Sequence, residues 1–133
     1  MGGDLAPAPI LEGALAATVS FDPDDTLVLF GDEAIIEAGV ASSGVDAALI
    51  EVIPTSNEIE MNESPVEAAR SKPDSALVQM TRMAGPKAGD ARLDMAISAG
   101  NTGAFVAAAQ MHMRRLPGVA RPGIAAVVPT FAG

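Results

Sequence analysis

Short apolar runs separated by helical patterns constrain the fold of this chain more than any other feature. The runs at residues 26–30 and 47–53 are largely apolar and lack the alternation of a half-exposed strand. Such runs are typical of strands buried in a parallel sheet. Helical patterns fill the segments between them. We therefore predict an α/β fold with a mainly parallel sheet and helices on both faces, in three layers.

The boundaries of the other elements are indicated by capping and turn residues. Further strands are predicted at 93–98 and 124–128, and helices at 10–19, 33–41, 65–70, 75–84 and 105–114. Asp32 is a suitable N-cap for the helix that follows it. Ser64-Pro65-Val66-Glu67 has the pattern of a capping box.

The turn between the strand predicted at 93–98 and the next helix is the strongest candidate site. It reads Ser98-Ala99-Gly100-Asn101-Thr102-Gly103-Ala104. A turn of this kind presents backbone N–H groups at a helix N-terminus, where an anion can bind. Gly100 and Gly103 allow close approach to the backbone, and Ser98, Asn101 and Thr102 add side-chain donors. The turn predicts a phosphate site; the alternative is a tight connection whose glycines serve packing alone.

A second candidate segment lies at the start of the chain, at Gly2, Gly3 and Asp4. Loops that follow parallel strands gather at one edge of the sheet. This segment is therefore placed to form another wall of the same site. The alternative is a chain terminus without fixed structure.

The chain is acidic, with 17 acidic and 8 basic residues and a formal charge of −9. This charge disfavours binding to nucleic acid and to a broad anionic lipid surface. Arg114, Arg115 and Arg121 form one basic spot, suited to an acidic protein or a phosphate. The alternative for Arg114 and Arg115 is that cations are favoured at any helix C-terminus.

Cysteine is absent from the sequence, which excludes disulfides, thiolate catalysis and Cys-based metal sites. His112 is the one histidine, and we predict a partly exposed helix residue there, with neither a metal site nor a cofactor. Residues 95–113 carry no Asp, Glu, Lys or Arg, but the Gly-Asn-Thr-Gly turn divides this stretch. The first residues lack the pattern of a signal peptide, and we predict a soluble chain.

Four segments together carry a resemblance to a known family. They are Met1-Gly2-Gly3-Asp4, Ile59-Glu60-Met61-Asn62-Glu63-Ser64-Pro65-Val66-Glu67-Ala68, Ser98-Ala99-Gly100-Asn101-Thr102-Gly103-Ala104 and Leu116-Pro117-Gly118-Val119-Ala120-Arg121-Pro122. In these segments the chain resembles the N-terminal part of the bacterial PlsX phosphate acyltransferases. The match extends over essentially the whole chain.

The resemblance implies transfer of a fatty acyl group from acyl carrier protein to inorganic phosphate, which yields an acyl phosphate for phospholipid synthesis. It also implies a fold like that of isocitrate and isopropylmalate dehydrogenases, a homodimer, and a cytoplasmic location or one peripheral to the inner membrane. Membrane contact would come from a part outside this chain. Phosphate is itself an oxygen nucleophile, so no residue is assigned as catalytic.

The sequence also departs from the family pattern. The family's first strand and everything after Gly133 are absent, so residues 1–133 are expected to be a truncated, single α/β domain of a larger enzyme. Lys72-Pro73-Asp74-Ser75-Ala76 stands where members have a basic stretch followed by Asp-Ser-Ser. Two alternatives to the enzyme remain: a non-catalytic module that binds phosphate or a nucleotide, and an inactive fragment.

Overall fold

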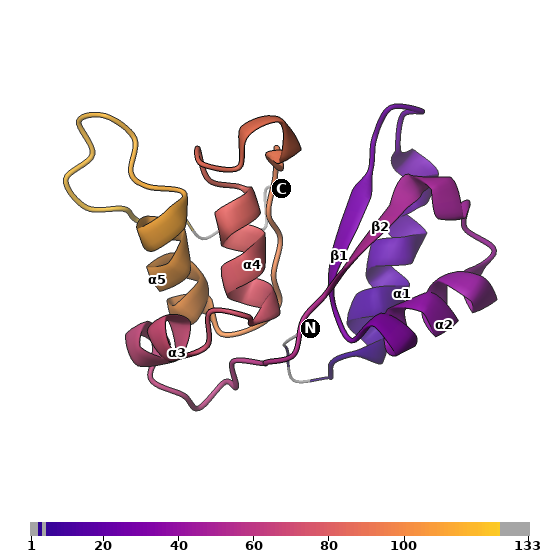
Figure 1. Ribbon diagram of the computed structural model, residues 1–133, viewed down its shortest axis with the longest axis horizontal. Helices are drawn as coiled ribbons and strands as arrows, with labels where there is room; N and C mark the ends of the chain where they lie inside the picture. Colours follow the sequence, from indigo (N-terminus) through magenta and orange to yellow (C-terminus); the bar gives the residue numbers. More distant parts are fainter. Residues whose placement is uncertain (1–2, 4, 126–133) are drawn as a thin grey trace, which may run out of the picture.

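The computed structural model describes residue 3 and residues 5–125. Its main elements, in chain order, are α1 (Ala8–Ala17), β1 (Leu27–Gly31), α2 (Glu33–Ser43), β2 (Ile50–Pro54), α3 (Pro65–Ser71), α4 (Ala76–Met83) and α5 (Thr102–His112) (Figure 1). Short 3-10 turns occur at Thr18–Ser20, Ala47–Leu49 and Gly89–Ala91. None of the helices in this described part has both the length and the apolar character needed to cross a bilayer.

The strands β1 and β2 form a parallel pair joined by α2. Leu27 pairs with Ile50 at one end and Gly31 with Pro54 at the other. The α/β class and the parallel pairing are confirmed, although the described residues contain a sheet of two strands only. The second strand begins later than predicted because Ala47–Leu49 forms a 3-10 turn, capped by the Asp46 carboxylate.

The strand predicted at 93–98 is wrong. This segment has no regular secondary structure and pairs with no strand in the described part of the chain. Met95 is 73 % and Ile97 80 % exposed. A strand needs a neighbour to satisfy its backbone groups, and none of the described residues provides one. The strand predicted at 124–128 falls largely outside the described residues, and its first two residues have no regular structure.

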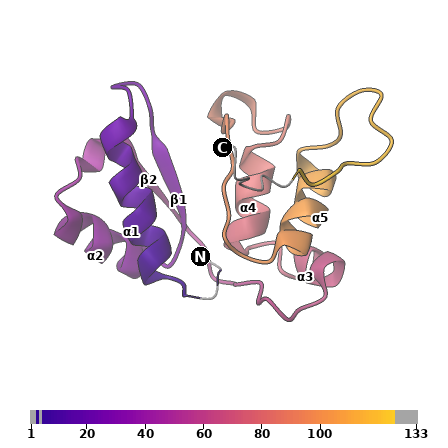
Figure 2. The same ribbon diagram turned by 180° about the vertical axis from the view of Figure 1, so that it is seen from behind.

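Among the residues that the structure describes, buried side chains form two clusters, one in each half of the molecule. Leu11, Leu15 and Ile36 pack with the two strands under α1 and α2. The second cluster joins α3, α4 and α5 through Ile59, Ala68, Ala69, Leu77, Val78, Ala104, Ala107 and Ala108. Figures 1 and 2 show α1 and α2 on one side of the strands and α3, α4 and α5 on the other. Helix α4 contacts β1 and links the two halves.

Two of the predicted caps have different outcomes. The Asp32 carboxylate accepts a hydrogen bond from the Ile35 N–H at 3.1 Å, as its position before α2 predicts. Ser64 occupies the N-cap of α3 and Pro65 its first turn, but the Ser64 side chain makes no cap hydrogen bond. The capping-box pattern therefore marks the correct boundary without the predicted side-chain contact.

Candidate anion site at the start of helix α5

The helix predicted at 105–114 begins three residues earlier, because Asn101 caps it. Its side-chain Oδ1 accepts from the Ala104 N–H at 3.0 Å, and its carbonyl accepts from the Phe105 N–H at 2.9 Å. The Gly100 N–H donates to Ser98 Oγ at 3.2 Å. Within the described residues, the N–H groups of Thr102 and Gly103 have no hydrogen-bond partner.

Two backbone donors at the positive end of a helix of 11 residues are therefore unpaired as far as the described residues go, an arrangement that attracts an anion. Ser98, Thr102 and Gly103 are all exposed here. The hydroxyl groups of Ser98 and Thr102 are the side-chain donors that remain in reach of solvent at this turn. The structure thus brings together most of the residues that the sequence singled out.

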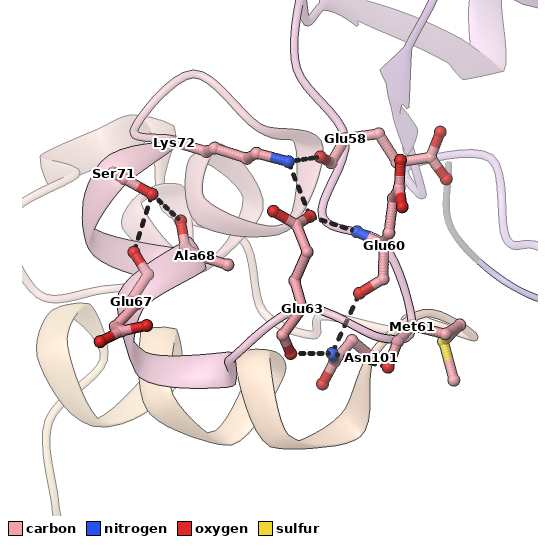
Figure 3. A network of polar contacts seen from close by, with 9 residues as sticks. All are labelled: Glu58, Glu60, Met61, Glu63, Glu67, Ala68, Ser71, Lys72 and Asn101. Atoms are coloured by element: carbon pink, nitrogen blue, oxygen red, sulfur yellow. Dashed lines mark hydrogen bonds and ion pairs between the residues drawn. The ribbon is translucent and has the colours of Figure 1, made fainter.

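Asn101 has a different place from the one that the sequence predicts. Its side-chain Nδ2 donates to the carbonyl oxygens of Glu60 at 3.1 Å, Met61 at 3.4 Å and Glu63 at 3.4 Å (Figure 3). The residue is 6 % exposed. Both ends of the amide are thus occupied by the protein itself, and Asn101 positions the turn against the loop at 58–63.

That loop is held from its other side by Lys72. The Lys72 ammonium lies 2.6 Å from Glu63 Oε2 and donates to the Glu58 carbonyl at 2.7 Å. Glu63 Oε2 also accepts from the Glu60 N–H at 2.7 Å (Figure 3). The hydrogen bonds from Lys72 and from the Glu60 N–H hold the pKa of Glu63 below its usual range.

The sequence alone indicates a solvated loop at Glu58, Glu60 and Glu63; Glu58 and Glu60 are exposed, and Glu63 is partly exposed and paired with Lys72. The buried Ile59 anchors the same loop in the core beneath α3 and α5. Lys72 and Glu63 are nine residues apart on either side of helix α3, and no local pattern predicts their contact.

Gly103 serves packing as well as access. A Cβ atom added to Gly103 would lie 2.8 Å from Cγ of Pro65, the first residue of α3. Helix α3 therefore approaches the start of α5 too closely for a side chain at this position. Close packing at Gly103 and anion binding there are compatible, because packing involves the Cβ side of the residue and anion binding would involve its N–H group.

The start of the chain lies beside this turn. A Cβ atom added to Gly3 would be 3.2 Å from the carbonyl oxygen of Ala99, and Gly3 has a φ of 139°, a value that favours glycine. The two candidate segments are therefore neighbours at Gly3. Gly2 and Asp4 lie outside the described residues.

A hollow of about 490 Å³ lies elsewhere, at the carboxyl ends of β1 and β2. Asp32, Glu33 and Asp74 line it, together with Thr55, Ser56 and Gln79. Three carboxylates would repel a phosphate, so the turn before α5 is the better anion site. Among the described residues, no group of three or more His, Asp or Glu side chains is placed to hold a metal ion.

Comparison with known proteins supports a single family over the whole length. The profile of the fatty acid synthesis protein family matches residues 1–133. The chain belongs to this family.

Several curated relatives of this family member carry the name phosphate acyltransferase. One from Pseudomonas fluorescens (strain Pf0-1) is 37 % identical over 134 residues, covering 100 % of this chain and 38 % of the relative. One from Acaryochloris marina is 41 % identical over 132 residues, covering 98 % and 36 %. One from an Exiguobacterium species is 39 % identical over 135 residues, covering 100 % and 38 %. The chain thus spans little more than a third of these relatives.

His112, Arg114 and Arg115, which the sequence also singled out, lie at the far end of α5. His112 is the last residue of the helix and is partly exposed, as predicted. Burial, with the charges of Arg82 and Lys87, lowers its pKa. Arg114 and Arg115 follow the helix rather than complete it, since α5 ends two residues earlier than predicted. They lie well away from the unpaired N–H groups at its start.

Proposed function

We propose that the chain is the N-terminal part of an acyltransferase that moves a fatty acyl group from acyl-acyl carrier protein to inorganic phosphate. The observation that carries this proposal is the pair of N–H groups, of Thr102 and Gly103, that have no partner among the described residues at the start of α5. The names of the curated relatives, phosphate acyltransferase, add the reaction class.

The proposed reaction needs phosphate held in line with a thioester carbonyl. A phosphate oxygen attacks the carbonyl carbon, a carbon–oxygen bond forms, and the carbon–sulfur bond breaks. The carrier protein leaves as a thiol, having taken the proton from hydrogen phosphate, and the acyl phosphate serves phospholipid synthesis. The contribution of this chain is binding and orientation: two backbone donors and the helix dipole at phosphate oxygens, with Ser98 and Thr102 hydroxyls beside them.

The proposal extends to the protein that contains this chain. Its partners are acyl carrier protein and phosphate, and no metal or cofactor enters the reaction. The sheet is completed to a three-layer fold like that of isocitrate and isopropylmalate dehydrogenases. The protein is a homodimer in the cytoplasm or at the periphery of the inner membrane. Gly2, Gly3 and Asp4 also belong to the proposed phosphate site, of which Gly3 lies beside Ala99, and residues outside this chain complete it.

Substitution of Thr102 by proline tests one of the two backbone donors directly. Proline is tolerated at the first position of a helix, so Thr102→Pro deletes one N–H group and leaves α5 intact. Thr102→Ala is the matched control because it removes the hydroxyl and keeps the N–H group. A hydrogen bond to a charged group contributes about 1.5–3 kcal/mol, which predicts phosphate binding at least roughly tenfold weaker in Thr102→Pro than in Thr102→Ala.

Binding is measured by ³¹P NMR titration of the chain with inorganic phosphate. Activity is measured as phosphate-dependent acyl phosphate formation by a chimaera in which this chain replaces the matching segment of the Pseudomonas fluorescens relative. Equal phosphate affinity in Thr102→Pro and Thr102→Ala would remove the Thr102 N–H group from the site and overturn the proposal that this helix start binds phosphate. Phosphate binding by an inactive chimaera would favour a non-catalytic phosphate-binding or nucleotide-binding module.

A further inference from the structure

Positive charge is concentrated in the last part of this acidic chain. Residues 1–81 contain 15 of the 17 acidic residues and two of the eight basic ones, a formal charge of −13. Residues 82–133 contain six basic and two acidic residues, a formal charge of +4, and no acidic residue follows Asp94. The chain is therefore strongly polarised along its sequence.

The fold collects most of these cations at one end of two helices. The C-terminal ends of α4 and α5 are in contact, since a Cβ atom added to Gly85 would lie 2.5 Å from the His112 carbonyl oxygen. Figures 1 and 2 show the segments that follow α4 and α5 extending from this same end. We call it the basic end; its cationic residues are Arg82, Lys87, Arg114, Arg115 and Arg121.

Arg82 and Lys87 lie close enough to His112 to influence its pKa. Burial, with the charges of Arg82 and Lys87, lowers the pKa of His112. None of the five cations forms an ion pair with a carboxylate in the part of the chain that the structure describes. Two helix C-termini carry roughly one negative charge between them, so they compensate only a small part of this charge.

The segment after α5 also forms a shaped surface. A hollow of about 420 Å³ is lined by Gln110, Arg114, Arg115, Leu116, Gly118 and Val119. Arg115 Nη1 donates to the Ala120 carbonyl, and this hydrogen bond closes the loop between the two residues. Leu116 is 76 % and Val119 40 % exposed. The surface thus combines exposed aliphatic side chains with a cationic rim, the composition of a protein-binding patch.

We propose that the basic end is a docking surface for an acidic protein. This inference rests on the proposed function, under which the docked partner is the acidic acyl carrier protein that supplies the acyl group. Arginine matches carboxylates with two parallel hydrogen bonds, and complementary charge steers the encounter. The basic end and the unpaired N–H groups lie at opposite ends of α5, about 16 Å of helix apart. A carrier protein docked there would deliver its tethered thioester along α5.

Charge favours a compact protein partner over a membrane. A flat anionic bilayer would also approach the rest of the chain, whose first 81 residues have a formal charge of −13. A small acidic protein engages the basic end alone. The Arg-lined hollow is also suited to a protruding acidic side chain.

The test compares two charge reversals of equal size in the full chain. Arg114→Glu places a carboxylate in the hollow, and Arg70→Glu makes the same change at an exposed position in the last turn of α3. Binding of acyl carrier protein is measured by NMR titration at two salt concentrations. We expect Arg114→Glu to weaken binding at least tenfold, Arg70→Glu to change it less than twofold, and salt to weaken binding to the unsubstituted chain. Leu116→Ser should also weaken it. Equal effects of the two reversals would overturn the proposal.

The same variants distinguish binding of the carrier protein from binding of a membrane or of a free anion. Vesicles of phosphatidylglycerol and phosphatidylcholine, and inorganic phosphate, are titrated against each variant. Vesicle binding without carrier-protein binding would overturn the proposal in favour of a membrane surface, and carrier-protein binding abolished by millimolar phosphate alone would reduce it to an anion site. Arg114→Glu should leave the phosphate titration unchanged.

The two proposals can fail independently. If Thr102→Pro weakens phosphate binding while Arg114→Glu leaves carrier-protein binding intact, the docking surface fails and the proposed function stands. If Arg114→Glu weakens carrier-protein binding while Thr102→Pro leaves phosphate binding unchanged, the docking surface stands and the phosphate site at the start of α5 fails.

Discussion

Asn101 connects the start of α5 to the loop at 58–63 through both ends of one buried amide. Substitution by alanine removes the helix cap, which contributes about 1 kcal/mol, and leaves three partly buried carbonyl oxygens without this donor, at about 1–3 kcal/mol. We predict that Asn101→Ala lowers the free energy of unfolding by about 2–4 kcal/mol, measured by urea denaturation. In the chimaera it should also sharply reduce acyl phosphate formation, because the turn that we propose to hold phosphate loses its support.

Two further variants separate the contributions of Asn101. Asn101→Asp retains the oxygen that caps α5 but replaces the donor that faces three carbonyl oxygens, so it should destabilise the chain even though the cap survives. Asn62→Ala, at an exposed position in the same region, should change the free energy of unfolding by less than about 0.5 kcal/mol. An equal, small effect of Asn101→Ala and Asn62→Ala would contradict the positioning role of Asn101.

The ion pair between Glu63 and Lys72 makes stability depend on pH. The pKa of Glu63 is lowered in the folded chain, so the folded state favours the ionised carboxylate. The stabilisation is therefore present above the usual glutamate pKa of about 4.3. It is lost as the pH falls below that value, through the lowered folded pKa. We predict that thermal stability falls more steeply below about pH 5 in the unsubstituted chain than in Glu63→Gln.

Glu67→Gln is the control for this pH effect, since Glu67 makes no ion pair among the described residues. Its pH profile should follow that of the unsubstituted chain. Identical profiles for the unsubstituted chain and Glu63→Gln would show that the Lys72 contact does not stabilise the fold.

These residue contacts also mark how far a sequence predicts a site. The composition of the turn at 98–104 indicates an exposed anion site, and Ser98, Thr102 and Gly103 are exposed there. It does not predict that Asn101 turns inward, because its three carbonyl partners lie 38 to 41 residues away. Side-chain donors that are equivalent in a sequence are separated by the packing of distant segments.

At the scale of elements, two glycines in helices should respond in opposite ways to the same substitution. Gly103→Ala places a Cβ atom 2.8 Å from Pro65 Cγ and forces α3 away from α5. Gly13→Ala, in α1, meets no atom within 4 Å. Overpacking costs about 1–3 kcal/mol, whereas alanine is favoured over glycine in an exposed helix by about 1 kcal/mol. Thermal denaturation should show Gly103→Ala destabilised and Gly13→Ala stabilised; stabilisation of both would contradict close packing of α3 on α5.

The elements themselves were predictable where their determinants are local. Asp32 caps α2 in the structure, and Pro65 begins α3, as the sequence indicates. The segment at 93–98 is the exception. Its composition is that of a buried strand, but Met95 and Ile97 are exposed because no neighbouring strand is present among the described residues. A strand depends on a partner, whereas a capped helix depends mainly on its own sequence.

At the scale of the whole molecule, the two clusters of buried side chains set how the chain should unfold. One lies beneath α1 and α2 and the other between α3, α4 and α5, and both consist of aliphatic residues and alanine. The sequence predicts the residue types of these cores but not their division. That division follows from where the sheet ends, which apolar periodicity alone does not specify.

We predict that the two halves unfold as separate units. Ile36 is fully buried in the first cluster and Leu77 is 8 % exposed in the second. Truncation of such residues to alanine costs about 2–5 kcal/mol. Because the halves share few buried side chains, Ile36→Ala should lower amide hydrogen-exchange protection in α1, α2, β1 and β2 while α3 to α5 keep theirs, and Leu77→Ala should do the reverse. Equal loss of protection throughout the chain in both variants would instead indicate one cooperative core, coupled through the contact of α4 with β1.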